Sequence, residues 1–138
     1  MDPSSTIAPE PVRQATEAPL LLCVEDEPAF LEMMTRELQH AGYRILGART
    51  VEDALDHFQQ EGAGISLVIA DFRLRAGTAL DLFARMRVLG PVPRFLICTG
   101  MIFPQARDQL QAAGLTRYLF KPFRIPELLE TVRRNLEA

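Results

Sequence analysis

One run of residues, Ser66-Leu67-Val68-Ile69-Ala70-Asp71, predicts the architecture around which the rest of the chain is arranged. Its four consecutive apolar residues, two of them β-branched, are typical of a strand that is buried on both faces. The run ends on Asp71, and open α/β sheets place their ligand sites at the carboxyl ends of parallel strands. Taken alone, Asp71 is more simply explained as the start of a turn. A functional role for it therefore depends on what ends the other strands.

The composition is that of an ordinary soluble globular protein. The chain has 138 residues, of which 48% are hydrophobic and 24% charged, enough for one domain with a substantial core. A net charge of −3 argues against a nucleic-acid-binding surface. No apolar run approaches the ~20 residues of a membrane span, and the first twenty residues lack a secretory signal. We therefore expect a cytoplasmic protein with no nucleic-acid or membrane partner.

Two further features support this interpretation of the chain. Residues 1–19 contain four prolines among Ser, Thr, Glu and Ala, which predicts a disordered leader or linker followed by one domain at 20–138. Cys23 and Cys98 both lie in apolar runs, so we expect buried free thiols in a reducing cytosol rather than a disulfide or a metal pair.

Five strand-like runs alternate with five helical patterns along the domain. Strands are expected at 20–24, 43–48, 66–70, 94–98 and 118–120, and helices at about 28–41, 50–61, 78–89, 104–113 and 126–136. This alternation predicts an α/β fold, in which a doubly wound parallel sheet is covered by helices on both faces as a three-layer sandwich.

The third and fourth helical patterns also predict which side chains face the core. In the third, the apolar side consists of Leu82, Phe83, Met86 and Leu89. In the fourth it is thin, with two of its four members only alanine: Phe103, Ala106, Leu110 and Ala113. Little burial makes local opening cheapest in this fourth helix.

Reactive side chains follow four of the five predicted strands. Because these ends share one edge, the sheet would bring together Glu25, Asp26, Asp71, Thr99 and Lys121. Clustered carboxylates raise one another's pKa, and a divalent cation such as Mg²⁺ relieves the conflict. A carboxylate beside Mg²⁺, a lysine and a hydroxyl suits phosphoryl transfer. Separate explanations exist for each residue, such as a solvated lysine or an acidic helix start, but they do not account for all five at one edge.

Four motifs resemble the receiver domain of bacterial two-component response regulators. They are LCVEDEP at 22–28, LVIADFRL at 67–74, CTG at 98–100 and YLFKPF at 118–123. The resemblance extends from about Leu20 to Leu136 and implies a flavodoxin-like sheet of five parallel strands in the order 2-1-3-4-5, with five helices.

The resemblance also implies a role for each residue at the edge. Asp71 would accept a phosphoryl group from the phosphohistidine of a sensor histidine kinase or a phosphotransfer protein. Asp26, Asp71 and the backbone carbonyl of Arg73 would bind Mg²⁺ directly, and Glu25 would act through a coordinated water. Lys121, whose bond to Pro122 is expected to be cis, would reach the phosphoryl oxygens.

Thr99 and Tyr118 match the hydroxyl and the aromatic ring that rearrange together on phosphorylation in this family. The face formed by the fourth helix, fifth strand and fifth helix would then change its binding to a downstream protein or its self-association. The chain would be no enzyme beyond self-catalysed phosphoryl acceptance and slow autodephosphorylation.

The chain departs from the usual family pattern at three places. Glu25 stands where Asp is more usual, Arg75 stands where Pro is most common, and Thr78-Ala79 replaces a common Asp-Gly. These changes put the geometry of the loop after Asp71 in question. They remove no chemical group that phosphorylation needs.

Two alternative functions compete with that of a phosphoacceptor. A pseudo-receiver would be a constitutive interaction module that is never phosphorylated, and the intact set of site residues argues against it. A hydrolase using an aspartyl-phosphate is disfavoured, because the position of its general acid, two residues after Asp71, holds Arg73. The start at Met1 and the end shortly after Leu136 favour a stand-alone regulator over a fragment of a larger regulator or hybrid kinase.

Overall fold

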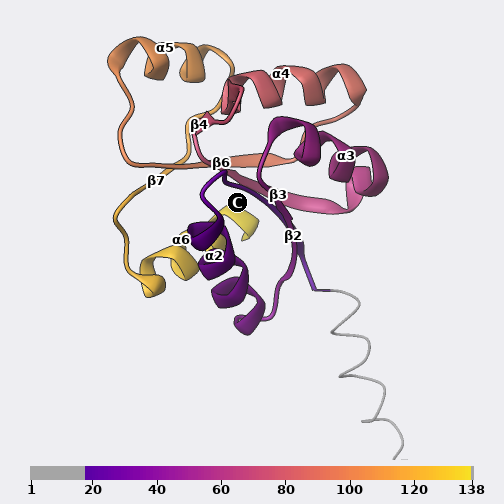
Figure 1. The fold of residues 1–138 in the computed structure, drawn as a ribbon, viewed down its shortest axis with the longest axis vertical. Coiled ribbons are helices and arrows are strands. Elements are labelled where there is room, and N and C mark those ends of the chain that lie inside the picture. The colour runs from indigo at the N-terminus through magenta and orange to yellow at the C-terminus, as the bar shows by residue number, and fades with distance from the viewer. Residues whose placement is uncertain (1–17, 138) are drawn as a thin grey trace, which may run out of the picture.

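The computed structural model describes residues 18–137, which form a three-layer α/β sandwich (Figure 1). Its central sheet has five parallel strands in the order β2-β1-β3-β6-β7. The strands are β1 (Leu20–Val24), β2 (Arg44–Ala48), β3 (Ile65–Ala70), β6 (Arg94–Thr99) and β7 (Tyr118–Phe120). The predicted fold is therefore confirmed, because this is the 2-1-3-4-5 order expected from the sequence.

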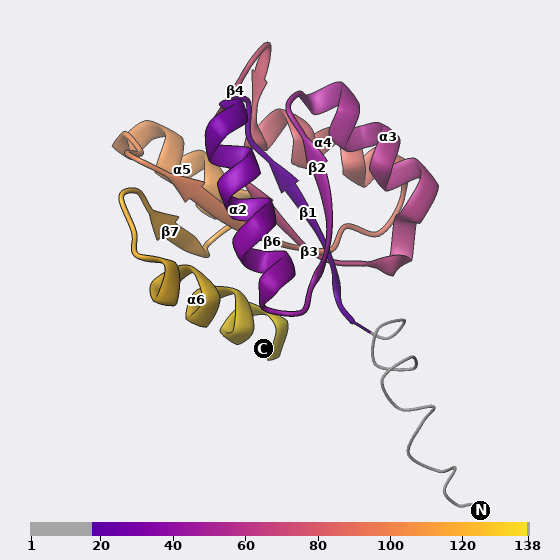
Figure 2. The same ribbon diagram turned by 60° about the horizontal axis from the view of Figure 1, so that its bottom comes forward.

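Five α-helices within residues 18–137 cover the two faces of the sheet (Figures 1 and 2). On one face lie α2 (Pro28–His40) and α6 (Ile125–Glu137), and on the other lie α3 (Val51–Glu61), α4 (Ala79–Leu89) and α5 (Pro104–Ala112). None of these helices combines the length and the apolar character needed to cross a membrane.

The central strand β3 contributes to both cores, which explains its unbroken apolar run. Val68 and Ala70 pack in the core under α3, α4 and α5, whereas Leu67 and Ile69 pack in the core under α2 and α6. None of these four side chains is appreciably exposed. A strand that has no solvent face cannot alternate polar and apolar residues, so the run in the sequence reflects its position in the middle of the sheet.

Hydrogen-bonded caps fix where α3 and α4 begin. The Thr50 hydroxyl accepts a hydrogen bond from the backbone N–H of Asp53 at 3.0 Å. At the start of α4, Thr78 and Asp81 form a reciprocal capping box, in which each side chain accepts from the other residue's backbone N–H. Both threonines satisfy helix donors that would otherwise lack a partner.

The segment after Asp71 forms a short hairpin that the sequence did not predict. Its strands β4 (Arg73–Leu74) and β5 (Gly77–Thr78) pair antiparallel. The turn requires a left-handed backbone at Ala76, with φ of 64°. At Gly77 any side chain would approach the Asp81 carboxylate, because a Cβ built there lies 3.2 Å from Oδ2.

Two apolar side chains expected in the core are instead exposed. Leu89 is 46% exposed at the C-terminal end of α4, where it is the last helical residue before Gly90. Phe103 is 56% exposed because it precedes α5 as its N-cap residue, and its ring lies under the guanidinium of Arg73 instead. Within α5 only Leu110 is buried, so the stripe that holds this helix is even thinner than expected.

The predicted leader falls on residues 1–19, and positions 1–17 lie outside the described residues. The backbone carbonyls of Ala18 and Pro19 accept hydrogen bonds from Arg44, at 2.9 and 3.0 Å, just before β1 begins.

Candidate functional site

The parallel ladder continues one residue beyond three strand ends and thereby fixes the site residues. The backbone N–H groups of Glu25, Asp71 and Lys121 each donate to a carbonyl of the neighbouring strand, at 2.9, 3.1 and 2.9 Å. Each of these residues therefore has a backbone position as well defined as that of a strand residue. The structure brings them to one edge of the sheet, as the alternation of strands and helices predicted.

Three carboxylates converge at this edge. Glu25, Asp26 and Asp71 each offer an oxygen that lies within 4.8 Å of the other two. Glu25 is buried, and the other two acids are half-buried. Three negative charges this close repel one another. An all-oxygen donor set of this kind fits a hard divalent cation.

One ammonium group lies among these carboxylates. Lys121 Nζ is 2.8 Å from Glu25 Oε1 and 3.3 Å from Asp71 Oδ2. Burial lowers the pKa of Lys121, but the hydrogen bond from its ammonium to Glu25 and the charge of Asp71 outweigh that effect and raise the pKa overall. The lysine is therefore a cation at neutral pH and partly balances the acids.

Burial has the largest effect on the pKa of Glu25. It raises the pKa of the Glu25 carboxyl by more than the hydrogen bonds from Lys121 and from the Glu27 backbone lower it. The charge of Asp71 adds to the rise. The site thus holds its negative charge at a cost, and an added cation would reduce that cost.

Thr99 and Asp71 open onto a shared hollow of about 400 Å³, which Arg73, Gly100 and Phe103 also line. Thr99 is buried at the end of β6. This places a hydroxyl residue and a carboxylate on one solvent-open space, and the same carboxylate lies 3.3 Å from the Lys121 ammonium.

The sequence also matches a known protein family. Residues 21–133 match the response regulator receiver domain family. The chain belongs to this family. The predicted resemblance is confirmed, and the chain is a receiver domain of the two-component response regulator type.

Known relatives agree with this membership. The receiver domain is 28% identical over 117 residues to the sensor kinase CckA of Brucella abortus, covering 85% of this chain and 12% of the kinase. It is 31% identical over 119 residues to the alginate biosynthesis transcriptional regulatory protein AlgB of Pseudomonas putida, covering 86% of this chain and 26% of AlgB. The chain thus spans well under half the length of these two relatives.

Solved structures share the fold. The non-phosphorylated HemR receiver domain from Leptospira biflexa superposes with a TM-score of 0.76 at 29% identity, covering 87% of this chain and 95% of that one. The chemotaxis protein CheY4 of Vibrio cholerae gives a TM-score of 0.77 at 27% identity, covering 85% of this chain and 98% of CheY4.

Tyr118 lies beside the site rather than in it. It pairs with Ile97 on β6, and its hydroxyl donates to the Leu115 carbonyl at 3.1 Å. Its half-buried ring stacks on Phe120, with the centroids 5.8 Å apart. The peptide bond between Lys121 and Pro122 in the following loop is cis, as the resemblance implied.

One residue beside the site, Phe30, is not distinguished by the sequence. The ring centroid of Phe30 lies 4.1 Å from Lys121 Nζ. In the sequence, the spacing of Phe30 is typical of the apolar stripe of a helix, because periodicity indicates the buried side of a helix and not the group that a ring covers. Its position four residues after Asp26, in the first turn of α2 at the site edge, was the available signal.

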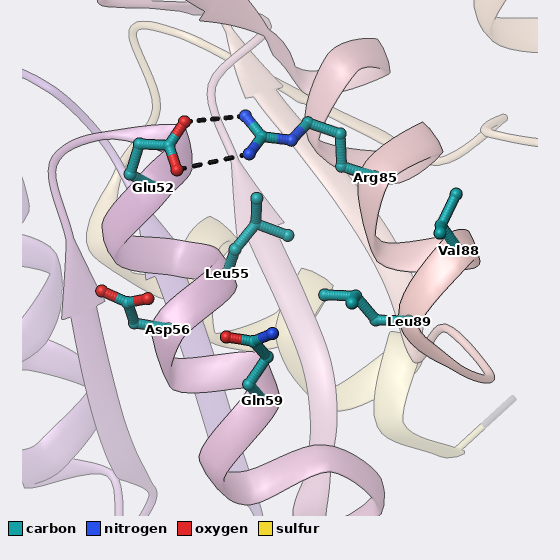
Figure 3. A pocket seen from close by; sticks show the side chains of 7 residues that line it. All are labelled: Glu52, Leu55, Asp56, Gln59, Arg85, Val88 and Leu89. Atoms are coloured by element: carbon teal, nitrogen blue, oxygen red, sulfur yellow. Dashed lines mark hydrogen bonds and ion pairs between the residues drawn. The ribbon is translucent and has the colours of Figure 1, made fainter.

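The receiver domain has a second hollow, between α3 and α4 (Figure 3). It has a volume of about 290 Å³ and includes none of the site carboxylates among its lining residues. Glu52 and Arg85 form a two-bond ion pair across it, at 2.8 and 3.3 Å. The clustered acids, the lysine and the hydroxyl lie elsewhere, so this hollow lacks the groups that converge at the sheet edge.

Proposed function

We propose that this receiver domain accepts a phosphoryl group on Asp71, with Mg²⁺ as cofactor, and so acts as the switch of a two-component or phosphorelay system. The observation that carries the proposal is the position of the Lys121 ammonium, 3.3 Å from Asp71 Oδ2 beside two further carboxylates. A lysine at this distance is placed to meet negative charge that arrives at Asp71.

Asp71 is the nucleophile of the proposed reaction. A carboxylate oxygen of Asp71 forms a bond to phosphorus while the bond from phosphorus to the donor's imidazole nitrogen breaks, and the electron pair of that bond stays on the nitrogen. Lys121 stabilises the charge on the transferred group. The donor is a sensor histidine kinase or a phosphotransfer protein.

The acidic cluster fits Mg²⁺ because three carboxylates within 4.8 Å outnumber the single ammonium among them. Asp26, Asp71 and the backbone carbonyl of Arg73 would hold the ion, and Glu25 would contact it through water. Bound there, Mg²⁺ supplies positive charge that neutralises the phosphoryl oxygens.

The output surface of the proposed switch is formed by α5, β7 and α6. Thr99 ends the strand that leads toward α5, and Tyr118 lies on neighbouring β7. Because α5 buries only Leu110, its displacement costs little packing. The large exposed side chains Met101, Phe103 and Phe120 lie in and beside these elements and suit a downstream protein or a second copy.

Incubation with acetyl phosphate and Mg²⁺ tests the proposal directly. Intact-mass measurement should show one added phosphoryl group, which disappears when Asp71→Asn removes the nucleophile and when Mg²⁺ is omitted. Asp56→Asn is the matched control, because Asp56 is exposed and lines the hollow between α3 and α4.

Labelling of Asp71→Asn equal to that of the unchanged protein would contradict the assignment. A folded, unchanged protein that takes up no phosphoryl group would support the pseudo-receiver alternative instead.

A further inference from the structure

The ammonium of Lys121 has a third neighbour besides its two carboxylates. The ring of Phe30, in the first turn of α2, has its centroid 4.1 Å from Nζ. This distance is well within the ~6 Å at which the face of an aromatic ring attracts a cation. The lysine side chain remains 24% exposed, so it also has access to water.

The Phe30 ring is itself held in place. Phe123 meets it edge to face, with the centroids 5.7 Å apart and the planes at 73°. The backbone N–H of Phe30 donates to the Glu27 side chain at 3.1 Å. Phe123 comes two residues after Lys121, so a single loop contributes both the lysine and the ring that buttresses Phe30.

An ammonium group has three N–H donors and no acceptor. Two directions of Lys121 Nζ are used by Glu25 and Asp71, at 2.8 and 3.3 Å. The Phe30 ring covers a further side, which a lysine would otherwise turn toward water, since lysines extend their ammonium groups into solvent when nothing holds them.

We propose that Phe30 is a positioning residue for Lys121. Its ring attracts the ammonium and keeps it directed at Asp71, so that no reorientation is needed when a phosphoryl group arrives. A leucine would fill similar space without attracting the cation. This inference rests on the proposed phosphoacceptor function.

A double-mutant cycle with beryllofluoride, a mimic of the phosphoryl group, tests the role. Calorimetric titration in Mg²⁺ should show that Phe30→Leu weakens binding about three- to tenfold, the effect of a cation–π contact of ordinary strength. Phe30→Tyr, which keeps an aromatic face, should restore binding to within about twofold. In a Lys121→Met background, Phe30→Leu should have no further effect.

An equal loss from Phe30→Leu in both backgrounds would overturn the proposal, because the ring would then act through general packing. Binding by Phe30→Leu equal to that of the unchanged protein would overturn it too.

Proton NMR provides a second measurement that does not depend on ligand binding. The ε-methylene protons of Lys121 should be shifted upfield by the Phe30 ring, and the shift should vanish in Phe30→Leu. Lack of an upfield shift in the unchanged protein would overturn the contact even if the leucine variant failed to fold. Failure of the unchanged protein to bind beryllofluoride while the shift is present would instead count against the proposed function.

Discussion

Two ion pairs in this domain have the same length, but the pKa of the glutamate is raised in one and lowered in the other. The ammonium of Lys121 lies 2.8 Å from the Glu25 carboxylate at the sheet edge, and the guanidinium of Arg85 lies 2.8 Å from Glu52 between α3 and α4 (Figure 3). The side chains of the first pair are 24% and 5% exposed, and those of the second are 51% and 72% exposed.

The two glutamates respond in opposite directions. The pKa of Glu52 is lowered, chiefly by its hydrogen bond from Arg85, because an exposed carboxylate loses little hydration. The pKa of Glu25 is raised, because burial outweighs the same kind of hydrogen bond from Lys121. Burial, rather than distance, therefore separates the pair that joins two helices from the pair at the candidate functional site.

The largest expected effect is on phosphorylation when each cation is removed in turn. Lys121→Met should slow uptake from acetyl phosphate about 100-fold or more, the loss typical of removing one group that stabilises developing charge. Arg85→Met is the matched control and should react at the unchanged rate. Time courses of intact mass measure both, and equal rates for the two variants would show that Lys121 does not act on the phosphoryl group.

An intermediate effect is expected on stability, with opposite signs for the two glutamates. Because the folded-state pKa of Glu25 is raised, the stability linked to this group is present below its unfolded pKa and is lost as pH rises through the folded value. Glu25→Gln mimics the neutral acid. In metal-free buffer at pH 7 it should raise the Tm, on the order of 2–4 °C, and the gain should fade toward pH 4.

Glu52→Gln provides the comparison. The lowered pKa of Glu52 means that its contribution is present above its unfolded pKa and is lost as pH falls through the folded value. Glu52→Gln should therefore leave the Tm at pH 7 unchanged or slightly lower it. Thermal unfolding at several pH values checks both variants, and a Tm that falls in Glu25→Gln would refute the dominance of burial.

The sequence predicted the parts of this site that depend on backbone order. An apolar run locates a buried strand, and parallel strands carry the next residue to a common edge, so Glu25, Asp71 and Lys121 followed from position alone. The helix starts expected at 50 and 78 are local in the same way, because each threonine caps a backbone N–H within the first turn of its helix.

Contacts between side chains from distant segments were not predictable in this way. Phe30 and Lys121 are 91 positions apart in the sequence, and no local pattern links them. The hairpin at β4 and β5 depends on a left-handed backbone conformation at Ala76. Residues other than glycine adopt this conformation only rarely. Periodicity placed Leu89 and Phe103 inward because it does not register that one is the last residue of α4 and the other only the N-cap residue of α5.

The smallest expected effect is on the stability of Arg85→Met. Both partners of this pair are exposed, so water screens the attraction, and holding two long side chains in one geometry costs entropy. At 0.15 M salt, where screening acts over ~8 Å, the Tm should be unchanged within error, and a small loss should emerge only at low salt. Thermal unfolding at two salt concentrations checks this expectation. A loss at 0.15 M salt as large as the gain from Glu25→Gln would contradict it, because the bonds between Arg85 and Glu52 would then matter more than their exposure.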